Sequence, residues 1–369
     1  MQIRRVILKG VRNFVDLDRS FEDSWSGNVP DSLLLIGPNG SGKTTLLNVV
    51  ADLWQVFANC FREDGQFPLA ELPLMGDTLA HSDLAAIEIV GLEREPIWIF
   101  VSARQLSQDL VAQQVNSHRV GVLRSTAIRG GSLEGGLRSE EDQEIMYTSP
   151  GVAGRGAAGK SSEWQRLLAL RLVENIFGKH QDLPNIVYLE SETRVMLSLS
   201  EKFSVQRESE EFRWLARYEP TASRKGSLQN YLYNLKVVDE SAFQQIVQEA
   251  NKFLIGKRLD GFDKPTGDLM VETDGGERHP ITDLSSGEKQ VLLMLATITR
   301  WLRPGGIVLI DEPDLHLHSS LTTAFVGHLR RMVMAKNGQL IIASHAPELL
   351  QDFTTSHRVE LGSLSGVSR

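Results

Sequence analysis

The chain has 369 residues, of which 41% are hydrophobic, so it can bury a sizeable core as two or three domains or as one large α/β domain with insertions. A net charge of −8 argues against a surface that coats nucleic acid, but leaves a local basic groove open. The single cysteine, Cys60, excludes an internal disulfide and a Cys-x-x-Cys zinc site. No apolar run approaches the roughly 20 residues that span a bilayer, and the first residues do not resemble a secretory signal. We therefore expect a cytoplasmic protein with no membrane partner.

An apolar run at 33–36, the glycine-rich stretch 37–45 and a helical pattern that begins at Leu46 follow one another near the N-terminus. Strand, glycine loop and helix in this order, with the spacing G-x4-G-K-T, predict a phosphate-binding loop. Glycines let successive backbone N–H groups curl round a phosphate, and the helix presents the positive end of its dipole. Lys43 would add a charge toward the β- and γ-phosphates, and Thr44 would offer a hydroxyl to Mg²⁺. The nucleotide-binding residues expected here are Gly37, Asn39, Gly40, Ser41, Gly42, Lys43, Thr44 and Thr45.

The flanking stretches predict further strands and one irregular segment. Residues 1–21 alternate like two strands with a turn at Gly10, and the runs 86–90 and 97–101 are typical of a hairpin. Glycine and serine dominate from about 120 to 163. Because so few large apolar side chains cannot offset the entropy cost of ordering, we expect a flexible insertion there.

The middle of the chain is predicted to be mainly helical. Segment 154–161 imitates a second phosphate loop, but no apolar strand precedes it. Helical periodicity recurs at 164–178 and between 200 and 260, whereas 186–189 is a short buried strand that ends in polar residues. Ligands of open α/β sheets bind at the carboxyl ends of strands. Arg194 is therefore a candidate nucleotide or γ-phosphate sensor, with an ordinary salt bridge as the alternative. The expected domains are an N-terminal part with the phosphate loop at 1–119, the flexible insertion at 120–163, a helical lobe with a connecting strand at 164–269, and a C-terminal part at 270–369 that completes the nucleotide-binding domain.

The sequence Leu-Ser-Ser-Gly-Glu-Lys-Gln at 284–290 leads into an apolar run that predicts a buried helix. Ser285 and the Gly287 amide would lie at the N-terminus of this helix, where free N–H groups and the dipole bind anions. The same residues also fit a capping box between Ser285 and Glu288. The segments that follow favour the anion site.

Two apolar strands end in polar residues with chemistry of their own. The run 307–310 ends in Asp311 and Glu312, which would lie beside the phosphate loop at the carboxyl edge of a parallel sheet. There Asp311 would hold Mg²⁺ through water, and Glu312 would orient and deprotonate the attacking water. The next strand, 339–344, ends at His345, which is placed to touch a γ-phosphate and polarise the water.

This combination resembles the ABC-type ATPase superfamily, with 37–44 as Walker A, 284–290 as signature, 307–312 as Walker B and His345 as switch histidine. Ser-Gly-Glu-Lys in the signature and Asp-Glu-Pro-Asp-Leu-His-Leu-His after Walker B are similar to the RecF, SMC and OLD-like branch. The resemblance implies an α/β P-loop head with a mixed sheet, an antiparallel β subdomain and an inserted helical lobe, and it implies ATP and Mg²⁺ as cofactors. The site residues that it implies are Glu312, His345 and Lys43 for catalysis, Thr44 and Asp311 for Mg²⁺, Arg12 and Asn13 beside the adenine, and Ser285, Ser286, Gly287 and Glu288 in the signature.

Several positions depart from the family's pattern. Ser286 stands where many relatives have glycine, and no clear glutamine follows the third strand, where Glu190 or Glu192 is the candidate. His316 and His318 resemble a metal pair, but turn residues are the simpler interpretation because no third ligand lies nearby. Since the sequence ends shortly after its last strand, we expect no TOPRIM nuclease domain, zinc hook or coiled coil.

These features favour an ATPase that closes into a head-to-tail homodimer on ATP, with Ser285 and Gly287 gripping the γ-phosphate of the other copy. The resemblance implies a separately encoded effector, a nuclease or toxin, in prokaryotic phage defence. The alternative is a RecF- or SMC-type DNA-repair or DNA-clamp ATPase. Its basic groove would draw on Lys202, Arg207, Arg224, Lys225, Lys252, Lys257 and Arg258. Energising a transporter is a weaker alternative, because transporter ATPases usually carry glutamine where Glu288 stands.

Overall fold

The computed structural model of the protein describes residues 1–59, 77–80, 82–103, 118–124, 143–148, 183–194, 214–218, 228–263, 265 and 267–362. Several features named above lie outside these residues: Cys60, the imitation of a phosphate loop at 154–161, the helical pattern at 164–178, and the basic residues Lys202, Arg207, Arg224 and Lys225.

Six parallel strands form the sheet that carries the candidate site, in the order β15-β3-β14-β13-β8-β9. Their bounds are β3 Ser32–Ile36, β8 Ile186–Leu189, β9 Leu215–Arg217, β13 Ile307–Asp311, β14 Gln339–Ala343 and β15 Arg358–Glu360. Strands β13 and β14 are buried along their whole length, as their unbroken apolar runs require when both faces of a parallel sheet are covered. Because all six strands point the same way, the residues that follow them meet at one edge.

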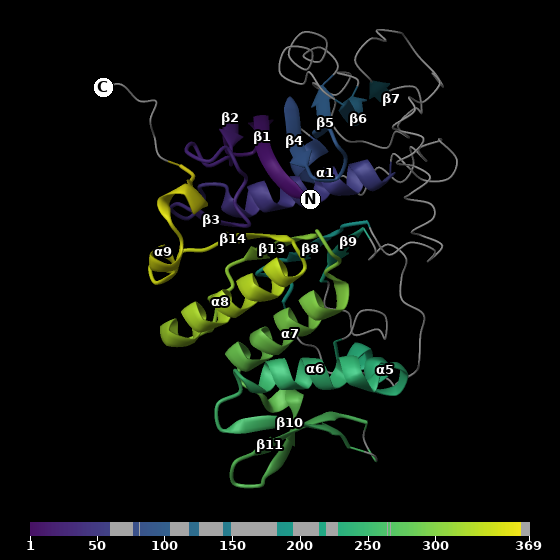
Figure 1. Ribbon diagram of the computed structural model, residues 1–369, viewed down its shortest axis with the longest axis vertical. Helices are drawn as coiled ribbons and strands as arrows, with labels where there is room; N and C mark the ends of the chain where they lie inside the picture. The colour runs from purple at the N-terminus through teal and green to yellow at the C-terminus, as the bar shows by residue number, and fades with distance from the viewer. Residues whose placement is uncertain are drawn as a thin grey trace, which may run out of the picture.

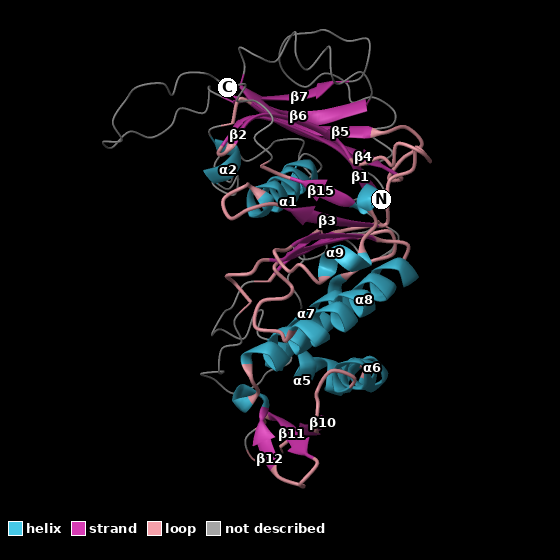
Figure 2. Cartoon of the chain, turned by 90° about the vertical axis from the view of Figure 1, so that its left-hand side faces the viewer, coloured by secondary structure: helices cyan, strands magenta, loops and turns pink. Residues whose placement is uncertain are grey.

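A second six-stranded sheet lies on the far side of helix α1 (Lys43–Asn59), which packs between the two sheets (Figures 1 and 2). Its order is β2-β1-β4-β5-β6-β7, and its neighbours are antiparallel except for β5 and β6. The bounds are β1 Gln2–Val11, β2 Phe14–Ser20, β4 Leu84–Val90, β5 Ile97–Ala103, β6 His118–Arg124 and β7 Gln143–Thr148. Trp54 and Phe57 of α1 are fully buried in the core between the sheets. This core fixes the helix that the phosphate loop opens.

Two details of the second sheet differ from the sequence-based expectations. The turn between β1 and β2 lies at Arg12 and Asn13 rather than at Gly10, because Val11 still pairs with Phe14. Strands β6 and β7 fall at the start of and within 120–163, for which we expected a flexible insertion, and they extend the sheet by pairing with β5 and with each other. β-branched and aromatic residues, among them Val120, Val122, Ile145 and Tyr147, favour extended backbone in these two segments despite the surrounding glycines.

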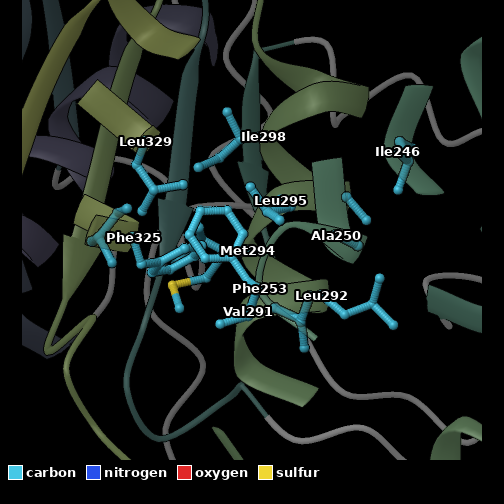
Figure 3. Close-up of a cluster of buried hydrophobic side chains, with 14 of the residues drawn as sticks. Ile246, Ala250, Phe253, Val291, Leu292, Met294, Leu295, Ile298, Phe325 and Leu329 are labelled. Carbon is cyan, nitrogen blue, oxygen red and sulfur yellow. The ribbon is translucent and has the colours of Figure 1, made fainter. Parts of the chain in front are cut away.

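Helices cover the other face of the parallel sheet, and a small antiparallel sheet of order β10-β11-β12 lies beyond them (Figure 1). The helices on this face are α5 Leu228–Val238, α6 Glu240–Asn251, α7 Ser286–Trp301, α8 Ser319–Ala335 and α9 Leu349–Asp352, and the small sheet comprises β10 Lys257–Phe262, β11 Leu269–Thr273 and β12 Arg278–Pro280. The short helix α2 (Asp77–Ala80) instead lies beside α1, with Leu79 in the core between the two large sheets. Short 3-10 turns span Ile281–Asp283 and Thr355–His357. Side chains of α6, α7 and α8 share one apolar cluster, which includes Ile246, Met294 and Phe325 (Figure 3). Helix α7 is therefore packed on several sides, as its nearly continuous apolar sequence predicts.

The expected fold class is confirmed: an α/β head with parallel and antiparallel sheets and a helical layer around α5 and α6. The domain boundaries stay predictions. Within the described residues, every helix is too short or too polar to cross a membrane.

Candidate nucleotide-binding site

Four residues from three distant parts of the sequence meet at the carboxyl edge of the parallel sheet. Thr44, at the start of α1, donates a hydrogen bond from Oγ1 to Oδ2 of Asp311 at 2.8 Å. Glu312 follows directly, and His345 after β14 places Nε2 3.8 Å from Glu312 Oε1. Parallel pairing of β13 with β14, and of β14 with β3, creates this meeting point. The P-loop, Walker B and switch-histidine positions thus belong to one site.

Lys43 is buried at the first position of α1. Its ammonium donates to the carbonyls of Gly37 at 2.9 Å and Pro38 at 3.1 Å, inside the loop. Burial lowers the pKa of Lys43, while the carboxylates of Glu312 and Asp311 oppose that shift. The ammonium therefore sits in the cradle of the loop, where an incoming phosphate would take the place of carbonyl oxygens as its partner.

Residues of the β1–β2 turn pack onto the phosphate loop. Gly42 has a φ of 97°, and a Cβ there would lie 2.4 Å from the Phe14 ring, so this position accepts only glycine. Asn13 donates from Nδ2 to the carbonyl of Gly40 at 2.6 Å. Arg12 is exposed at the same turn, with a φ of 48°. The two residues expected beside the adenine therefore border the loop, and Asn13 contacts it directly.

Asp311 is 2% exposed and its two carboxylate oxygens differ in their surroundings. Oδ2 accepts from Thr44 and also from Ser191 Oγ at 3.2 Å. Oδ1 is buried and has no hydrogen-bond partner among the described residues. A buried carboxylate oxygen without a partner is costly. A hydrated Mg²⁺ ion would supply the missing donors, so these residues fit the metal: Thr44 would bind it directly, and Asp311 would hold it through water.

Ser191 is a site residue that the sequence reasoning did not select. We expected Glu190 or Glu192 near the metal, but Glu190 faces β9, where its Oε1 lies 3.1 Å from Nε of Arg217. Glu192 is exposed. The hydroxyl of Ser191 between them contacts the Asp311 carboxylate instead. Polar residues after a buried strand were the available signal, but their order along a turn does not tell which one points inward.

Arg194 is not placed to sense a γ-phosphate, so that expectation is wrong. Its side chain is 2% exposed, and its donors bind the carbonyls of Asp311 and Glu312 at 2.6 and 2.7 Å and the side chain of Gln290 at 2.7 Å. The salt-bridge alternative is not seen either, because the hydrogen bonds of this guanidinium end on carbonyl and amide oxygens. Arg194 lies behind the site and supports its backbone.

The signature segment caps helix α7. Ser285 Oγ accepts from the amide of Glu288, and the Glu288 carboxylate accepts from the amide and hydroxyl of Ser285, both at 2.8 Å, which completes a capping box. Lys257 Nζ lies 3.0 Å from the same carboxylate. Burial alone would raise the pKa of Glu288, but the hydrogen bonds from Ser285 and Lys257 outweigh it and lower the pKa.

The exposed start of α7 is separate from the phosphate loop of its own chain. Ser285 and Ser286 are exposed, whereas Gly287 is buried, and a Cβ there would lie 2.6 Å from the carbonyl oxygen of His316. Among the described residues, no hydrogen bond joins Ser285, Ser286 or Gly287 to the loop at 37–45. The N-terminus of α7 is thus exposed at Ser285 and Ser286 and capped from within its own helix.

The two histidines after Walker B serve the backbone. His318 is the N-cap of α8, where Nδ1 accepts from the Ser320 amide at 3.4 Å. His316 has a φ of 65° and turns its carbonyl toward Gly287. The described part of the chain contains no group of three or more potential metal-ligating side chains.

The fold and the site resemble those of ABC-type ATPases of the RecF, SMC and OLD-like branch. Residues 182–351 match the family model described as "AAA domain, putative AbiEii toxin, Type IV TA system".

Similarity to individual proteins is local. The retron Ec83 probable ATPase of Escherichia coli is 37% identical over 93 residues, which cover 22% of this chain and 17% of that protein. The DNA double-strand break repair Rad50 ATPase of Saccharolobus solfataricus is 30% identical over 98 residues, which cover 26% of this chain and 11% of that protein. A solved SMC head bound to the C-winged helix domain of ScpA matches 98% of each chain with a TM-score of 0.47 and 13% identity. The chain spans less than a quarter of the length of the curated relatives it matches.

Proposed function

We propose that this protein hydrolyses ATP with Mg²⁺ in the cytoplasm, closes into a head-to-tail homodimer on ATP, and regulates a separately encoded effector in prokaryotic phage defence. The observation that carries the enzymatic part is the buried Asp311 carboxylate, one oxygen of which is held by Thr44 and Ser191 while the other has no partner among the described residues. That asymmetry is what a metal-bound water would satisfy.

The chain's own residues supply a complete set of roles for hydrolysis. Lys43 would bind the β- and γ-phosphate oxygens from within the loop, and Mg²⁺ when bound would neutralise phosphate charge. Glu312 would orient the attacking water and accept its proton. His345, 3.8 Å from Glu312, would contact the γ-phosphate and the same water. Each role needs a group at the carboxyl edge of the sheet, which is where the three side chains lie.

A second copy of the chain is the natural partner for the exposed start of α7. Ser285 and Ser286 lie exposed at a helix N-terminus, where Ser285 donates to Glu288 of its own chain, and among the described residues this end makes no hydrogen bond to its own phosphate loop. In a two-fold arrangement each signature would face the other copy's nucleotide, so that two equivalent sites form at once. We infer that ATP is the bridge that holds the dimer together.

Replacing Asp311 with asparagine tests the metal site. Asp311→Asn keeps the shape of the side chain but removes the charge that holds the metal's water. We expect the Mg²⁺ concentration for half-maximal phosphate release to rise about 10- to 100-fold, as for other groups that orient metal ligands. Asp260→Asn, which removes a carboxylate paired with Arg278 on the small sheet, is the control. An unchanged Mg²⁺ dependence for Asp311→Asn would contradict the assignment.

The defence role rests on the relatives rather than on the site. Retron ATPases and a phage lambda protein are among the matches, and the matching family model names a toxin of a toxin–antitoxin system. The effector would be a nuclease or toxin encoded elsewhere, which ATP binding and hydrolysis by this chain would control. In that arrangement the chain is a sensor or regulator rather than a self-contained enzyme.

A DNA-repair or DNA-clamp ATPase is the second candidate, favoured by the similarity to Rad50. Of the seven basic residues expected in a DNA groove, four lie outside the described residues, and each of the others is engaged with a carboxylate: Lys252 with Glu249, Lys257 with Glu288 and Arg258 with Glu272. Charges already paired release few counterions, so they contribute little to binding a phosphate backbone.

Duplex binding separates the two candidates. We expect no ATP-stimulated, salt-dependent binding of duplex DNA at low salt. Of the seven basic residues expected in the groove, the three that the structure describes are already paired with carboxylates. Fluorescence anisotropy with a labelled duplex, measured over a range of salt with and without ATP and Mg²⁺, gives the result. Binding that strengthens with ATP and weakens steeply as the salt concentration rises would favour the DNA-clamp ATPase.

A further inference from the structure

Arg194 connects two parts of the site that are far apart in the sequence. It lies on the turn after β8 and is almost completely buried. Its guanidinium donates to the carbonyls of Leu189 at 3.4 Å, Asp311 at 2.6 Å and Glu312 at 2.7 Å, and its Nε donates to Gln290 Oε1 at 2.7 Å. Gln290 returns a bond from Nε2 to the carbonyl of Arg194 at 2.6 Å. The two side chains therefore form a reciprocal pair behind the Walker B strand.

Burying this charge has a cost that simple packing would avoid. Desolvation lowers the pKa of Arg194 to about 10, against the opposing influence of the carboxylates of Asp311, Glu312 and Asp314. An apolar side chain of similar volume would fill the space without that penalty. What the arginine provides beyond an apolar side chain is therefore its hydrogen bonds. Three of its four acceptors are backbone carbonyls at the ends of β8 and β13, those of Leu189, Asp311 and Glu312.

The backbone that Arg194 holds is unusual. Glu312 has a φ of 48°, in the left-handed region that is unfavourable for a residue with a Cβ. Arg194 binds the carbonyl of Glu312 and that of the preceding residue, while the Glu312 amide donates to Ala343 at 2.7 Å. Three hydrogen bonds thus fix both peptide groups around Glu312 and set the direction of its carboxylate toward His345.

The same pair reaches the signature helix. Gln290 lies on α7, within two turns of Ser285, and is 7% exposed. A shift of α7 when its N-terminus meets a phosphate would pull on Gln290, on Arg194 and then on the Glu312 backbone. We propose that Arg194 is a positioning residue that sets the backbone of Asp311 and Glu312 for hydrolysis and couples it to the signature helix. This rests on the ATPase function proposed above.

Conservative variants test the coupling through turnover. Arg194→Lys keeps the charge but cannot make the planar set of bonds, so kcat should fall about 10- to 100-fold while the Kd for ATP stays within about twofold. Gln290→Met removes the reciprocal bonds at similar volume and should lower kcat less. In the double variant the two effects should be smaller than their product, because the residues act as one unit.

A second readout does not depend on turnover. Amide hydrogen exchange at 312–317, measured without nucleotide, should be at least about tenfold faster in Arg194→Lys and faster in Gln290→Met. The reason is that the hydrogen bonds from Arg194 to the carbonyls of Asp311 and Glu312 are lost or weakened. Arg358→Lys is the matched control: Arg358 also donates to two backbone carbonyls, those of Phe353 and Leu350, but away from the site. It should lower the melting temperature without changing kcat or this exchange.

The outcomes separate the two proposals. If the unaltered protein does not hydrolyse ATP, the proposed function is wrong, and hydrogen exchange alone decides whether Arg194 holds the Glu312 backbone. If it does hydrolyse ATP and Arg194→Lys keeps its kcat, the positioning role is wrong and the ATPase stands. If Arg194→Lys does not fold, Gln290→Met decides by the same two measurements, and unchanged kcat and exchange there overturn the proposal.

Discussion

A Glu312→Gln protein is expected to bind ATP as tightly as the unaltered protein and to hydrolyse it about 10²- to 10⁴-fold more slowly. Glutamine has nearly the shape of glutamate, so the left-handed backbone at this position and its bonds to Arg194 and Ala343 can persist. Its amide cannot accept the proton of the attacking water. Single-turnover phosphate release and equilibrium binding of a fluorescent ATP analogue give the two quantities.

The same protein should accumulate as a dimer, because ATP that is not hydrolysed continues to bridge two copies. Light scattering with ATP and Mg²⁺ should give twice the monomer mass, and without nucleotide the monomer mass. Glu277→Gln, on an exposed hairpin of the small sheet, is the matched control and should behave like the unaltered protein. If the Glu312→Gln protein stays monomeric with ATP, the proposal that ATP drives dimerisation is wrong. If its turnover is normal, Glu312 is not the general base.

Ser285→Ala is expected to spare ATP binding and to lower kcat about 100-fold, the typical cost of removing one donor that stabilises developing charge. Its hydroxyl lies at the exposed start of α7 and, within the part of the chain that the structure describes, bonds to Glu288 and not to its own phosphate loop. Loss of turnover with intact binding would therefore mean that the hydroxyl acts on another copy's nucleotide. Equilibrium binding and steady-state phosphate release separate the two effects.

The substitution also removes an N-cap, which costs about 1 kcal/mol of stability by itself. Asp239→Ala is the matched control, because Asp239 caps α6 through the Ala242 amide at 3.0 Å. Both variants should show a similar fall in the free energy of unfolding, and only Ser285→Ala should lose turnover. Equal losses of turnover would mean that Ser285 acts only as a cap.

The parts of the site that sequence reasoning located are those with local signals. The glycine loop before α1 and the apolar strands before Asp311 and His345 each combine a residue pattern with an element type, and parallel pairing then brings their ends together. Asp311 ends β13 and Thr44 lies at the start of α1, and both element boundaries are visible in the sequence. The contact between these two side chains could therefore be anticipated.

Other features depend on where side chains point, and no local pattern encodes that. Arg194 was assigned to the nucleotide because it follows a strand end, but its donors turn back to the carbonyls of Asp311 and Glu312. Ser191 was overlooked between two glutamates, although its hydroxyl, rather than either glutamate, contacts the Asp311 carboxylate. Strands β6 and β7 were missed because their pairing with β5 and with each other outweighs a glycine-rich composition.

Mixing two inactive variants tests most directly the claim that each site is shared between two copies. Lys43→Ala lacks the cation of its own phosphate loop, and Ser285→Ala lacks the hydroxyl that would complete the other copy's site. In a mixed dimer one site combines an intact Lys43 with an intact Ser285, so an equimolar mixture should recover about a quarter of the unaltered activity if copies pair at random. A mixture no more active than the two variants measured separately would contradict the shared site.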